Sequence, residues 1–457
     1  MLLGGFPFRL IRLTDAGART LDGLLAGPGR GTAAATLARR LLDAGVLIPG
    51  ALPHPHPPPQ SELSAVVPVR DDVDGLERCL RSLRAVWPEV DVVVVDDASL
   101  EGSAVTEVSL RYSARVIRND VPRGPGAARN AALSEVRTPF VVLIDADVEL
   151  IGADPWPRWW SLLEDDSVAV VAPRVRGFGG HGGSGTYERE RFPLDLGGLA
   201  GRIAPRARVT YAPAALLVAR IAALAEVGGF EPSLRYGEDV DLLWRLCDVG
   251  WRCWYDGATA ARHPVRPEQV SRARQRFRYG TSAAALAARH GDALSPWRGS
   301  RWTPAVLGLC LTGHPAVAVA TVGVNAAALQ RRLGARGIAP FTSLRLVAVG
   351  HATSGRALLR ALVRPWWPLT LLAVPLLPAR WRRRLLGSLM VPALAEWARR
   401  RPPLDPLRWT LWWLADDVVY GAGVWAGWWA NRRRPRAGSS LRPVFTEWSG
   451  SERDVPT

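Results

Sequence analysis

The chain has 457 residues and a formal net charge of +16, and all of its basic residues are Arg. This length exceeds that of most single domains, so we expect at least two. Residues 331–436 hold nineteen Arg against four acidic residues, which places nearly the whole positive excess in one C-terminal segment. A charge so localised argues against a nucleic-acid-binding protein and favours a local anionic partner, such as a membrane surface.

Residues 1–48 predict a small module of one extended segment, two helices and a closing apolar strand. These elements are expected at residues 6–13, 18–25, 32–43 and 46–48. Their order suggests a winged-helix-like or peptide-binding module. DNA binding is the weaker alternative, because the second helix offers only Arg39 and Arg40 to read bases. Residues 49–60 are rich in Pro and form a stiff linker that marks a domain boundary.

Alternating strands and helices begin at residue 63. Strands are expected at residues 63–69, 91–95, 115–118, 140–144, 168–172 and 251–255. This repeated spacing predicts an α/β domain with a parallel sheet and right-handed crossovers. Open sheets of this kind bind ligands at the carboxyl ends of their strands, so we expect a nucleotide site there.

Two carboxylates, Asp145 and Asp147, follow the apolar run 140–144 at that edge. Five apolar residues in a row indicate a strand that is covered on both faces. Carboxylate oxygens in this position suit Mg²⁺ or Mn²⁺, which share protein carboxylates with substrate phosphates. Taken alone, however, a D-x-D pair is more often a solvated strand end than a metal site, so other motifs must decide.

Two Gly-rich segments and one acidic helix start have more than one interpretation. The turn at 124–126 is not favoured as a dinucleotide-binding loop, because Arg129 occupies the third Gly position. The segment 177–185 is either a lid or a surface insert. Glu238 and Asp239 begin a helix, where capping by negative charge is the simplest interpretation.

Six short motifs occur in the chain order of one enzyme family. They spell VVPVR, VDDAS, GAARN, DAD, GGF and GED, at residues 66–70, 95–99, 126–130, 145–147, 228–230 and 237–239. In this order they resemble the inverting nucleotide-sugar glycosyltransferases of family 2, which have the GT-A fold. The resemblance extends over residues 64–279 and implies a GT-A domain at residues 61–290.

The resemblance also implies roles for individual side chains. Those that would bind the nucleotide-sugar donor are Pro68, Arg70, Asp96, Asp97, Arg129 and Asp145. Asp147 and His263 would hold Mg²⁺ or Mn²⁺, and Asp239 would be the base that deprotonates the acceptor hydroxyl. Those that would bind the acceptor are Glu238, Arg274, Gln275 and Arg278. The family's Q-x-x-R-W spelling is not kept there, which leaves processive transfer undecided.

The module at 1–48 is similar to the small peptide-binding modules of peptide-cofactor biosynthesis. Together with the linker and the transferase motifs, this similarity implies a peptide-derived redox cofactor as the acceptor. It also implies UDP-glucose as the donor and β-1,4-linked glucose in the product. Three alternatives stay open: a membrane polysaccharide or glycolipid glycosyltransferase, a non-catalytic peptide-binding scaffold with a vestigial transferase fold, and a nucleotidyltransferase.

Residues 291–437 predict a helical, membrane-associated region rich in Arg and Trp. The uncharged run at 302–330 is long enough to span a bilayer. Its Ala-rich composition, interrupted by His314, Pro315, Gly323 and Asn325, also fits a buried helix pair. Asp416 and Asp417 lie centrally in the run 409–430, where carboxylates in lipid would be costly unless they are paired.

Three Trp pairs lie beside Arg clusters in this region, at residues 366–367, 412–413 and 428–429. This combination favours helices lying on the cytoplasmic face of the cell membrane, with one or two spans as a variant and a soluble helical cap as the alternative. The four Cys lack a C-x-x-C spacing, and the N-terminus lacks a signal-peptide pattern, so we expect reduced thiols in a cytosolic setting. Residues 438–457 are expected to form a disordered tail.

Overall fold

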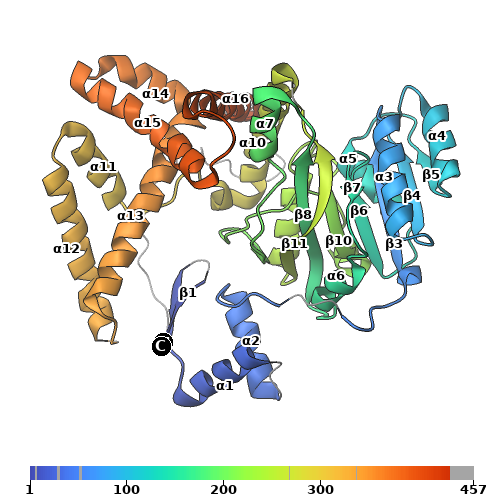
Figure 1. The fold of residues 1–457 in the computed structure, drawn as a ribbon, viewed down its shortest axis with the longest axis horizontal. Coiled ribbons are helices and arrows are strands. Elements are labelled where there is room, and N and C mark those ends of the chain that lie inside the picture. The colour runs from blue at the N-terminus through green and yellow to red at the C-terminus, as the bar shows by residue number, and fades with distance from the viewer. Residues whose placement is uncertain (6–7, 28–30, 51–53, 267, 336, 433–457) are drawn as a thin grey trace. The chain divides into compact units, whose positions relative to one another are not determined.

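The computed structural model describes residues 1–5, 8–27, 31–50, 54–266, 268–335 and 337–432. The chain divides into two compact units, Met1–Glu268 and Gln269–Thr457 (Figure 1). The tail expected at 438–457 lies outside the described residues. The predicted combination of an α/β core with a helical C-terminal region is confirmed.

One half of the central sheet is parallel. It contains β3 (Leu63–Val69), β4 (Asp91–Asp96), β5 (Arg115–Arg118) and β6 (Phe140–Ile144), in the order β5-β4-β3-β6. These bounds match the predicted strands to within one residue. The apolar runs in β3, β4 and β6 are buried on both faces, which is the condition that favours parallel strands.

The other half of the sheet is mixed. β10 (Leu216–Arg220) pairs antiparallel with both β6 and β8 (Val168–Phe178), and β8 runs parallel to β11 (Arg252–Pro264). The short strands β7 (Glu149–Leu150) and β9 (Gly201–Ile203) pair with β11. The predicted parallel sheet is therefore confirmed for the first half only, because the second half is mixed. No periodic signal marks β10 as a reversed strand, and both β8 and β11 continue past their apolar runs into polar residues.

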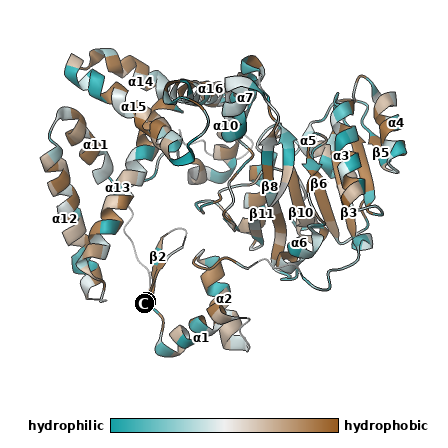
Figure 2. Ribbon diagram, viewed as in Figure 1, coloured by the Kyte–Doolittle hydropathy of each residue, from teal (hydrophilic) through white to brown (hydrophobic). Residues whose placement is uncertain are grey.

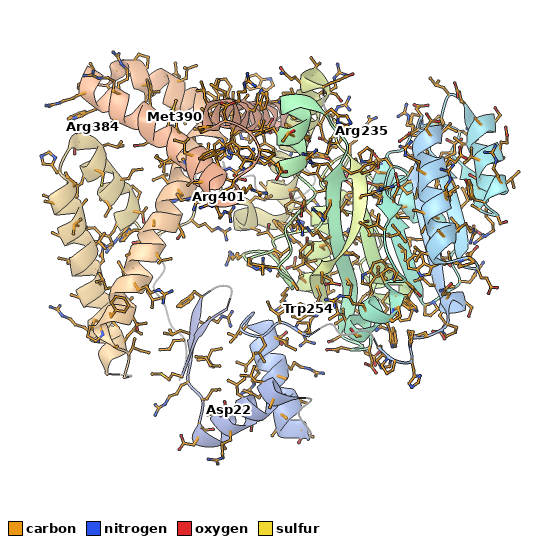
Figure 3. All side chains as sticks on the ribbon, viewed as in Figure 1. Asp22, Arg235, Trp254, Arg384, Met390 and Arg401 are labelled. Carbon is orange, nitrogen blue, oxygen red and sulfur yellow. The ribbon has the colours of Figure 1, made fainter. Side chains whose placement is uncertain are left out.

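Helices cover both faces of the sheet, and the alternation of strand side chains divides the core into two layers. In β4, residues 92 and 94 belong to one apolar cluster, and residues 93 and 95 belong to the other. The first cluster includes residues of α3 (Val73–Val86), α4 (Gly102–Arg111) and α6 (Trp156–Leu163), and the second includes residues of α5 (Pro125–Leu133), α8 (Ile221–Glu226) and α9 (Glu238–Asp248). Figure 2 shows apolar strands between these helices, and Trp254, labelled in Figure 3, belongs to the first cluster.

The Gly-rich segment 177–185, for which a lid or a surface insert is predicted, lies mostly within a strand and a helix. β8 continues to Phe178, and α7 (Gly182–Glu190) follows after only three residues. A Cβ atom on Gly185 would come within 3.0 Å of the backbone of Gly180. The glycines therefore allow a tight connection between a strand and a helix.

The N-terminal module folds as a short antiparallel hairpin followed by two helices. Its elements are β1 (Leu2–Gly4), β2 (Arg9–Ile11), α1 (Asp15–Ala26) and α2 (Thr32–Asp43). Both predicted helices are confirmed, and Thr14 caps α1 by accepting a hydrogen bond of 3.1 Å from the backbone N–H of Gly17. The closing strand predicted at 46–48 is wrong, because these residues turn back onto the carbonyl of Leu41 at the end of α2.

An ion pair joins this module to the sheet. The Asp43 carboxylate at the end of α2 accepts hydrogen bonds of 2.7 and 2.9 Å from the Arg252 guanidinium on β11. Arg202 donates a further hydrogen bond of 2.8 Å to the Asp43 carbonyl. Because a guanidinium fork fixes direction as well as distance, Asp43 orients α2 against the sheet.

The second unit is helical. Its helices are α10 (Gln269–His290), α11 (Trp302–Thr312), α12 (Pro315–Gly334), α13 (Pro340–Val363), α14 (Trp367–Ala373), α15 (Ala379–Arg400) and α16 (Pro406–Arg432). A Cβ atom on Gly280, Gly423 or Gly427 would lie under 3.0 Å from the backbone of the facing helix. These glycines therefore let α10 and α16 pack backbone against backbone.

Two adjacent carboxylates in the middle of α16, Asp416 and Asp417, are buried and paired. Arg272 and Arg276 of α10 lie 3.4 and 3.5 Å from Asp416. Arg360 of α13 and Arg364, the residue after that helix, lie 2.9 and 3.4 Å from Asp417. An unpaired buried charge would cost several kcal/mol. Arginines distant in the chain thus offset the free-energy cost of burying these two carboxylates.

The uncharged run at 302–330 is not a single helix. α11 and α12 are separated at Gly313, whose φ is 93°. Among the described residues, no single helix combines the length and the apolarity needed to cross a membrane. One helix pair, Pro340–Val363 with Trp367–Leu376, meets that criterion only when taken together, and it is bent by 84°.

Candidate active site

Strained backbone marks the carboxyl ends of β3 and β4. Asp71 and Ala98 have positive φ angles of 54° and 59°, a region that residues with a Cβ atom rarely adopt. Asp71 accepts a hydrogen bond of 2.8 Å from the backbone N–H of Leu100, and its own N–H donates to Ser99 at 3.0 Å. Each such residue costs about 1 kcal/mol or more and persists where the surroundings enforce it, typically at functional sites.

Asp96 and Asp97, predicted to bind the donor, are buried and hydrogen-bonded within the chain. Asp96 accepts a hydrogen bond of 2.8 Å from the backbone N–H of Ser99 and a second from Arg118. Asp97 accepts bonds of 2.9 and 2.8 Å from the backbone N–H groups of residues 123 and 124. Asp97 therefore fixes the turn that starts α5.

The other predicted donor residues at this edge are Pro68 and Arg70. Pro68 is half-buried in β3, opposite Val95 of β4. Arg70 follows the strand with an exposed side chain, 3.4 Å from the Asp71 carboxylate. Its guanidinium can therefore reach a ligand above the sheet.

Arg129 of α5 is the centre of the cluster. Its side chain is 3% exposed, and its two terminal nitrogens lie 2.5 Å from Asp145 and 3.2 Å from Glu238. The guanidinium also stacks on the Phe230 ring at 5.2 Å, while its Nε has no partner among the described residues. Burial would lower the pKa of Arg129, but the two carboxylates outweigh it and raise that pKa. One cation thus links α5, the end of β6 and the start of α9.

Asp147 lies beside His263, which β11 brings to the end of β6. The His263 Nε2 atom lies 3.1 Å from the Asp147 carboxylate, and its Nδ1 atom lies 2.7 Å from the carbonyl of Pro264. Burial would raise the pKa of Asp147, but the hydrogen bond to His263 outweighs it and the pKa is lowered. The adjacent Asp145 has a raised pKa, because burial outweighs the Arg129 charge.

This pair has the donor chemistry of a divalent-metal site. Without a metal, the His263 Nε2–H donates to Asp147 while Nδ1–H donates to the Pro264 carbonyl. A metal ion would take the place of the Nε2 proton, and the Nδ1–H bond would keep the ring oriented, as second-shell bonding does in metal-binding histidines. One carboxylate and one imidazole leave the remaining positions of a hexacoordinate ion to phosphates and water. Within the described residues, no group of three or more His, Cys, Asp or Glu side chains is arranged to hold a metal ion. The two predicted ligands therefore fit an ion that shares its coordination with a substrate.

Glu238 and Asp239 occupy the first turn of α9, after Gly237 in a left-handed conformation with φ 80°. Asp239 is half-buried and accepts hydrogen bonds from the backbone N–H groups of Ala214 at 3.3 Å and Val240 at 2.8 Å. Burial raises the pKa of Asp239, and burial with the Asp239 charge raises the pKa of Glu238 to about 7. A carboxylate with a raised pKa is a better proton acceptor near neutral pH.

Asn130 supports the site, although its motif predicts no role for it. Its amide donates to the Phe230 carbonyl at 2.7 Å and accepts from the Phe230 N–H at 2.8 Å. Gly229 has a φ of 68°, and a Cβ atom there would lie 2.5 Å from the Asn130 amide oxygen. The Ala-Arg-Asn motif was the available signal, because Asn130 directly follows Arg129.

The predicted acceptor residues Arg274, Gln275 and Arg278 lie on α10 and belong to the second unit. Gln275 is buried and donates a hydrogen bond of 3.0 Å to the hydroxyl of Tyr279. Arg274 and Arg278 are exposed. On this helix the two guanidinium groups are thus available to a ligand, whereas Gln275 supports its neighbour.

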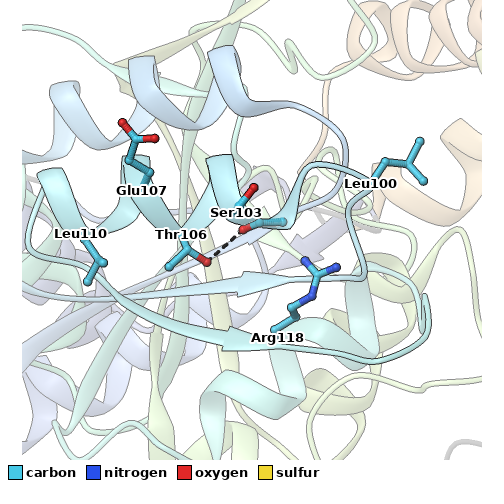
Figure 4. A pocket seen from close by; sticks show the side chains of 7 residues that line it. Leu100, Ser103, Thr106, Glu107, Leu110 and Arg118 are labelled. Atoms are coloured by element: carbon cyan, nitrogen blue, oxygen red, sulfur yellow. Dashed lines mark hydrogen bonds between the residues drawn. The ribbon is translucent and has the colours of Figure 1, made fainter.

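An open surface pocket lies at the edge of the sheet, between α4 and β5 (Figure 4). Its lining residues are Leu100, Gly102, Ser103, Thr106, Glu107, Leu110 and Arg118. None of the carboxylates at 145, 147, 238 and 239 lines it. The pocket touches the predicted donor site only through Arg118, which contacts Asp96.

Comparison with known proteins adds three findings. The sequence pattern described as glycosyl transferase family 2 matches residues 64–217. The chain is 35% identical over 448 residues to the pre-mycofactocin glycosyltransferase of Mycobacterium tuberculosis. The aligned region covers 93% of this chain and 91% of that protein. Among solved structures, mannosyltransferase PcManGT from Pyrobaculum calidifontis, in complex with GDP-Man and Mn²⁺, is 17% identical with a TM-score of 0.41, covering 82% of this chain and 97% of that one.

Proposed function

This chain belongs to glycosyl transferase family 2 and is a glycosyltransferase, and on that premise we propose that it glucosylates a peptide-derived redox cofactor of the mycofactocin kind. The proposed donor is UDP-glucose, and repeated transfer would build a short β-1,4-glucan. Identity of 35% across nearly the whole of both chains supports this acceptor class, because the relative is named for the same cofactor pathway.

The observation that carries the catalytic proposal is the bridge made by Arg129. It joins Asp145, on the proposed donor side, to Glu238, beside the proposed base Asp239. Because the guanidinium is buried and contacts both carboxylates, it fixes their positions relative to each other. Arg129 therefore acts in this proposal as a positioning residue for the two halves of the site.

Asp239 is the proposed base. Its carboxylate accepts the proton of the acceptor hydroxyl while the acceptor oxygen forms a bond to the anomeric carbon. The bond from that carbon to the nucleoside diphosphate breaks on the opposite side, which inverts the configuration. Half-burial leaves Asp239 accessible to an acceptor, and the raised pKa increases its affinity for the proton.

Asp147 and His263 are the proposed ligands of Mg²⁺ or Mn²⁺, which when bound would neutralise charge on the leaving diphosphate. Asp96, Asp97, Pro68 and Arg70 form the proposed wall for the nucleoside. In this wall, Asp97 acts through the turn that it holds, and Arg70 contributes an exposed guanidinium. The exposed Arg274 and Arg278 of α10 are proposed to contact the acceptor, and residues 1–48 its peptide part.

The test is transfer by purified protein supplied with Mn²⁺, UDP-glucose and the peptide-derived acceptor, followed by mass spectrometry. We expect acceptor products heavier by one hexose each and release of UDP. Asp147→Ala and Asp239→Asn should abolish transfer, whereas Asp248→Asn, an exposed carboxylate at the other end of α9, should not. Full activity of Asp239→Asn would remove its role. Release of pyrophosphate would indicate a nucleotidyltransferase, and the absence of any product with every donor tried would favour the scaffold.

A further inference from the structure

The second unit exposes a continuous apolar segment that no charged residue interrupts. It spans residues 369–379, from the middle of α14 through the short 3-10 turn Val374–Leu376 to the start of α15. Leu371, Leu372 and Leu376 are 64%, 71% and 84% exposed. We call residues 369–379 the apolar tip. Single exposed leucines are ordinary, but a whole exposed apolar segment marks an interaction surface.

Four arginines follow the apolar tip directly. Arg380, Arg382, Arg383 and Arg384, here called the arginine collar, lie in the first turns of α15, where no acidic residue accompanies them. A helix N-terminus favours negative charge, so this placement opposes the helix dipole. No described carboxylate pairs with Arg380, Arg382 or Arg383, all of which are exposed. These arginines therefore do not stabilise the start of α15. Their position is favourable only when an external anion binds them.

Tryptophans flank the apolar tip on both sides. Trp367 begins α14 and Trp381 lies within the arginine collar. Both side chains are half-buried, and the indole N–H of each is buried without a partner in the described structure. Tryptophan as a residue type is enriched at the boundary between apolar chains and polar headgroups, so the position of both residues beside the apolar tip agrees with such a boundary. By contrast, Trp413 of α16 is buried and donates to Glu396 at 2.9 Å, so the prediction that the 412–413 pair lies at an interface is wrong for Trp413.

We propose that the apolar tip inserts into the headgroup region of a bilayer that carries anionic lipids, while the arginine collar binds the lipid phosphates. Each contribution alone gives weak, reversible attachment, and the two together give stable attachment. Charge complementarity selects lipid over a protein partner, because residues 331–436 carry fifteen more positive than negative charges. Arg384, labelled on α15 in Figure 3, also holds the neighbouring helix by donating to the Leu311 carbonyl at 3.2 Å.

The experiment is co-sedimentation of the full chain with sucrose-loaded vesicles of phosphatidylcholine, with and without phosphatidylglycerol. We expect binding to the anionic vesicles that weakens with salt. The variant Leu371→Ser/Leu372→Ser/Leu376→Ser should weaken binding at least about tenfold. Arg382→Gln/Arg383→Gln should also weaken it about tenfold, and only on anionic vesicles. Circular dichroism establishes that each variant is folded.

Matched controls come from the first unit. Leu100, Leu110 and Leu199 are 92%, 67% and 70% exposed, so their triple Ser variant removes equally exposed leucines and should bind like the wild type. Arg12→Gln/Arg19→Gln removes two exposed arginines and should do the same.

Four results would overturn the proposal. Wild-type protein that stays in the supernatant with every kind of vesicle would exclude lipid as the binding partner of the apolar tip. Unchanged binding of the folded triple-Leu variant would exclude the apolar tip. Self-association or capture of a protein that is lost in this variant, without vesicle binding, would identify a protein interface. Retention in membranes after alkaline carbonate extraction would favour a span by the bent helix pair over interfacial insertion.

Discussion

Buried ionic clusters occur in both units, and they differ in balance. In the first unit, one cation, Arg129, is surrounded by the carboxylates of Asp145, Glu238 and the nearby Asp239. In the second unit, two carboxylates on α16 are surrounded by four arginines. The first cluster contains raised carboxylate pKa values and one unpaired guanidinium nitrogen. In the first cluster, the excess of carboxylates marks a site that a cationic or polar ligand can complete. In the second cluster, each carboxylate has two arginine partners on other segments, and the cluster holds the helices together.

The largest effect is expected from Arg129→Met. Removing the cation leaves the half-buried Asp145 and the buried Glu238 without their partner, which should cost about 3–5 kcal/mol of unfolding free energy. Transfer should fall about 1000-fold or more, because both halves of the site lose their common anchor. Urea unfolding and initial rates at a temperature where the variant is folded measure the two effects.

The matched control is Arg123→Met, an exposed arginine on the turn before α5. It should retain both stability and activity. An active and stable Arg129→Met variant would show that the bridge does not organise the site.

The second cluster should affect stability without affecting the donor site. Asp417→Asn leaves Arg360 and Arg364 facing a neutral amide and should destabilise the second unit by about 2–4 kcal/mol. Affinity for UDP, measured by calorimetry on the folded variant, should not change. Asp405→Asn, with a half-exposed carboxylate in the same unit, is the control. A large loss of UDP affinity in Asp417→Asn would mean that the two clusters are not separable.

The raised pKa of Glu238 predicts a pH dependence of stability. The folded chain keeps this proton to a pH of about 7, whereas the unfolded chain loses it near 4.5. Between these values the folded state binds more protons, so the free energy of unfolding falls as pH rises. Glu238→Gln should flatten this slope, by up to a few kcal/mol in total. Unfolding series across this range test it, with the exposed Glu89→Gln as the control; an unchanged slope would contradict the burial argument.

The smallest effect is expected where the N-terminal module meets the sheet. Asp43 is partly exposed, so Asp43→Asn should cost no more than about 1 kcal/mol. Its hydrogen bond to Arg252 lowers the pKa of Asp43, so the stabilisation is present above the usual Asp range and is lost as pH falls through the lowered value. Limited proteolysis of the module should be faster in Asp43→Asn than in Asp22→Asn, an exposed carboxylate labelled in Figure 3. Equal rates would show that the pair does not hold the module.

The fold of the first unit was largely predictable, because its parallel strands are short apolar runs separated by helices. The GT-A fold class is confirmed by the family match and agrees with the observed α/β sheet. The direction of β10 was not predictable, because a short apolar run has the same pattern whichever way it runs. The motifs identified Arg129, Asp145 and Glu238 separately, but the bridge between them spans 109 residues and follows from the tertiary structure.

The second unit was less predictable. Its helices have wide apolar faces, so periodicity did not separate buried from exposed sides. From the sequence alone, Asp416 and Asp417 argued against burial of α16. Their arginine partners on α10 and α13 are too distant in the chain to be recognised from local spacing. Apolar character alone likewise could not distinguish the buried Trp413 from the exposed leucines after α13.

Because of the glycine contact between α10 and α16, we expect these two helices to move together as one rigid unit. With no side chain between the backbones at Gly280, Gly423 and Gly427, one helix cannot slide past the other without a clash. A displacement of the α10 backbone at Arg274 or Arg278 would therefore also displace α16. A spectroscopic label near the end of α16 would report acceptor-induced motion of α10 without any change to the residues proposed to touch the acceptor.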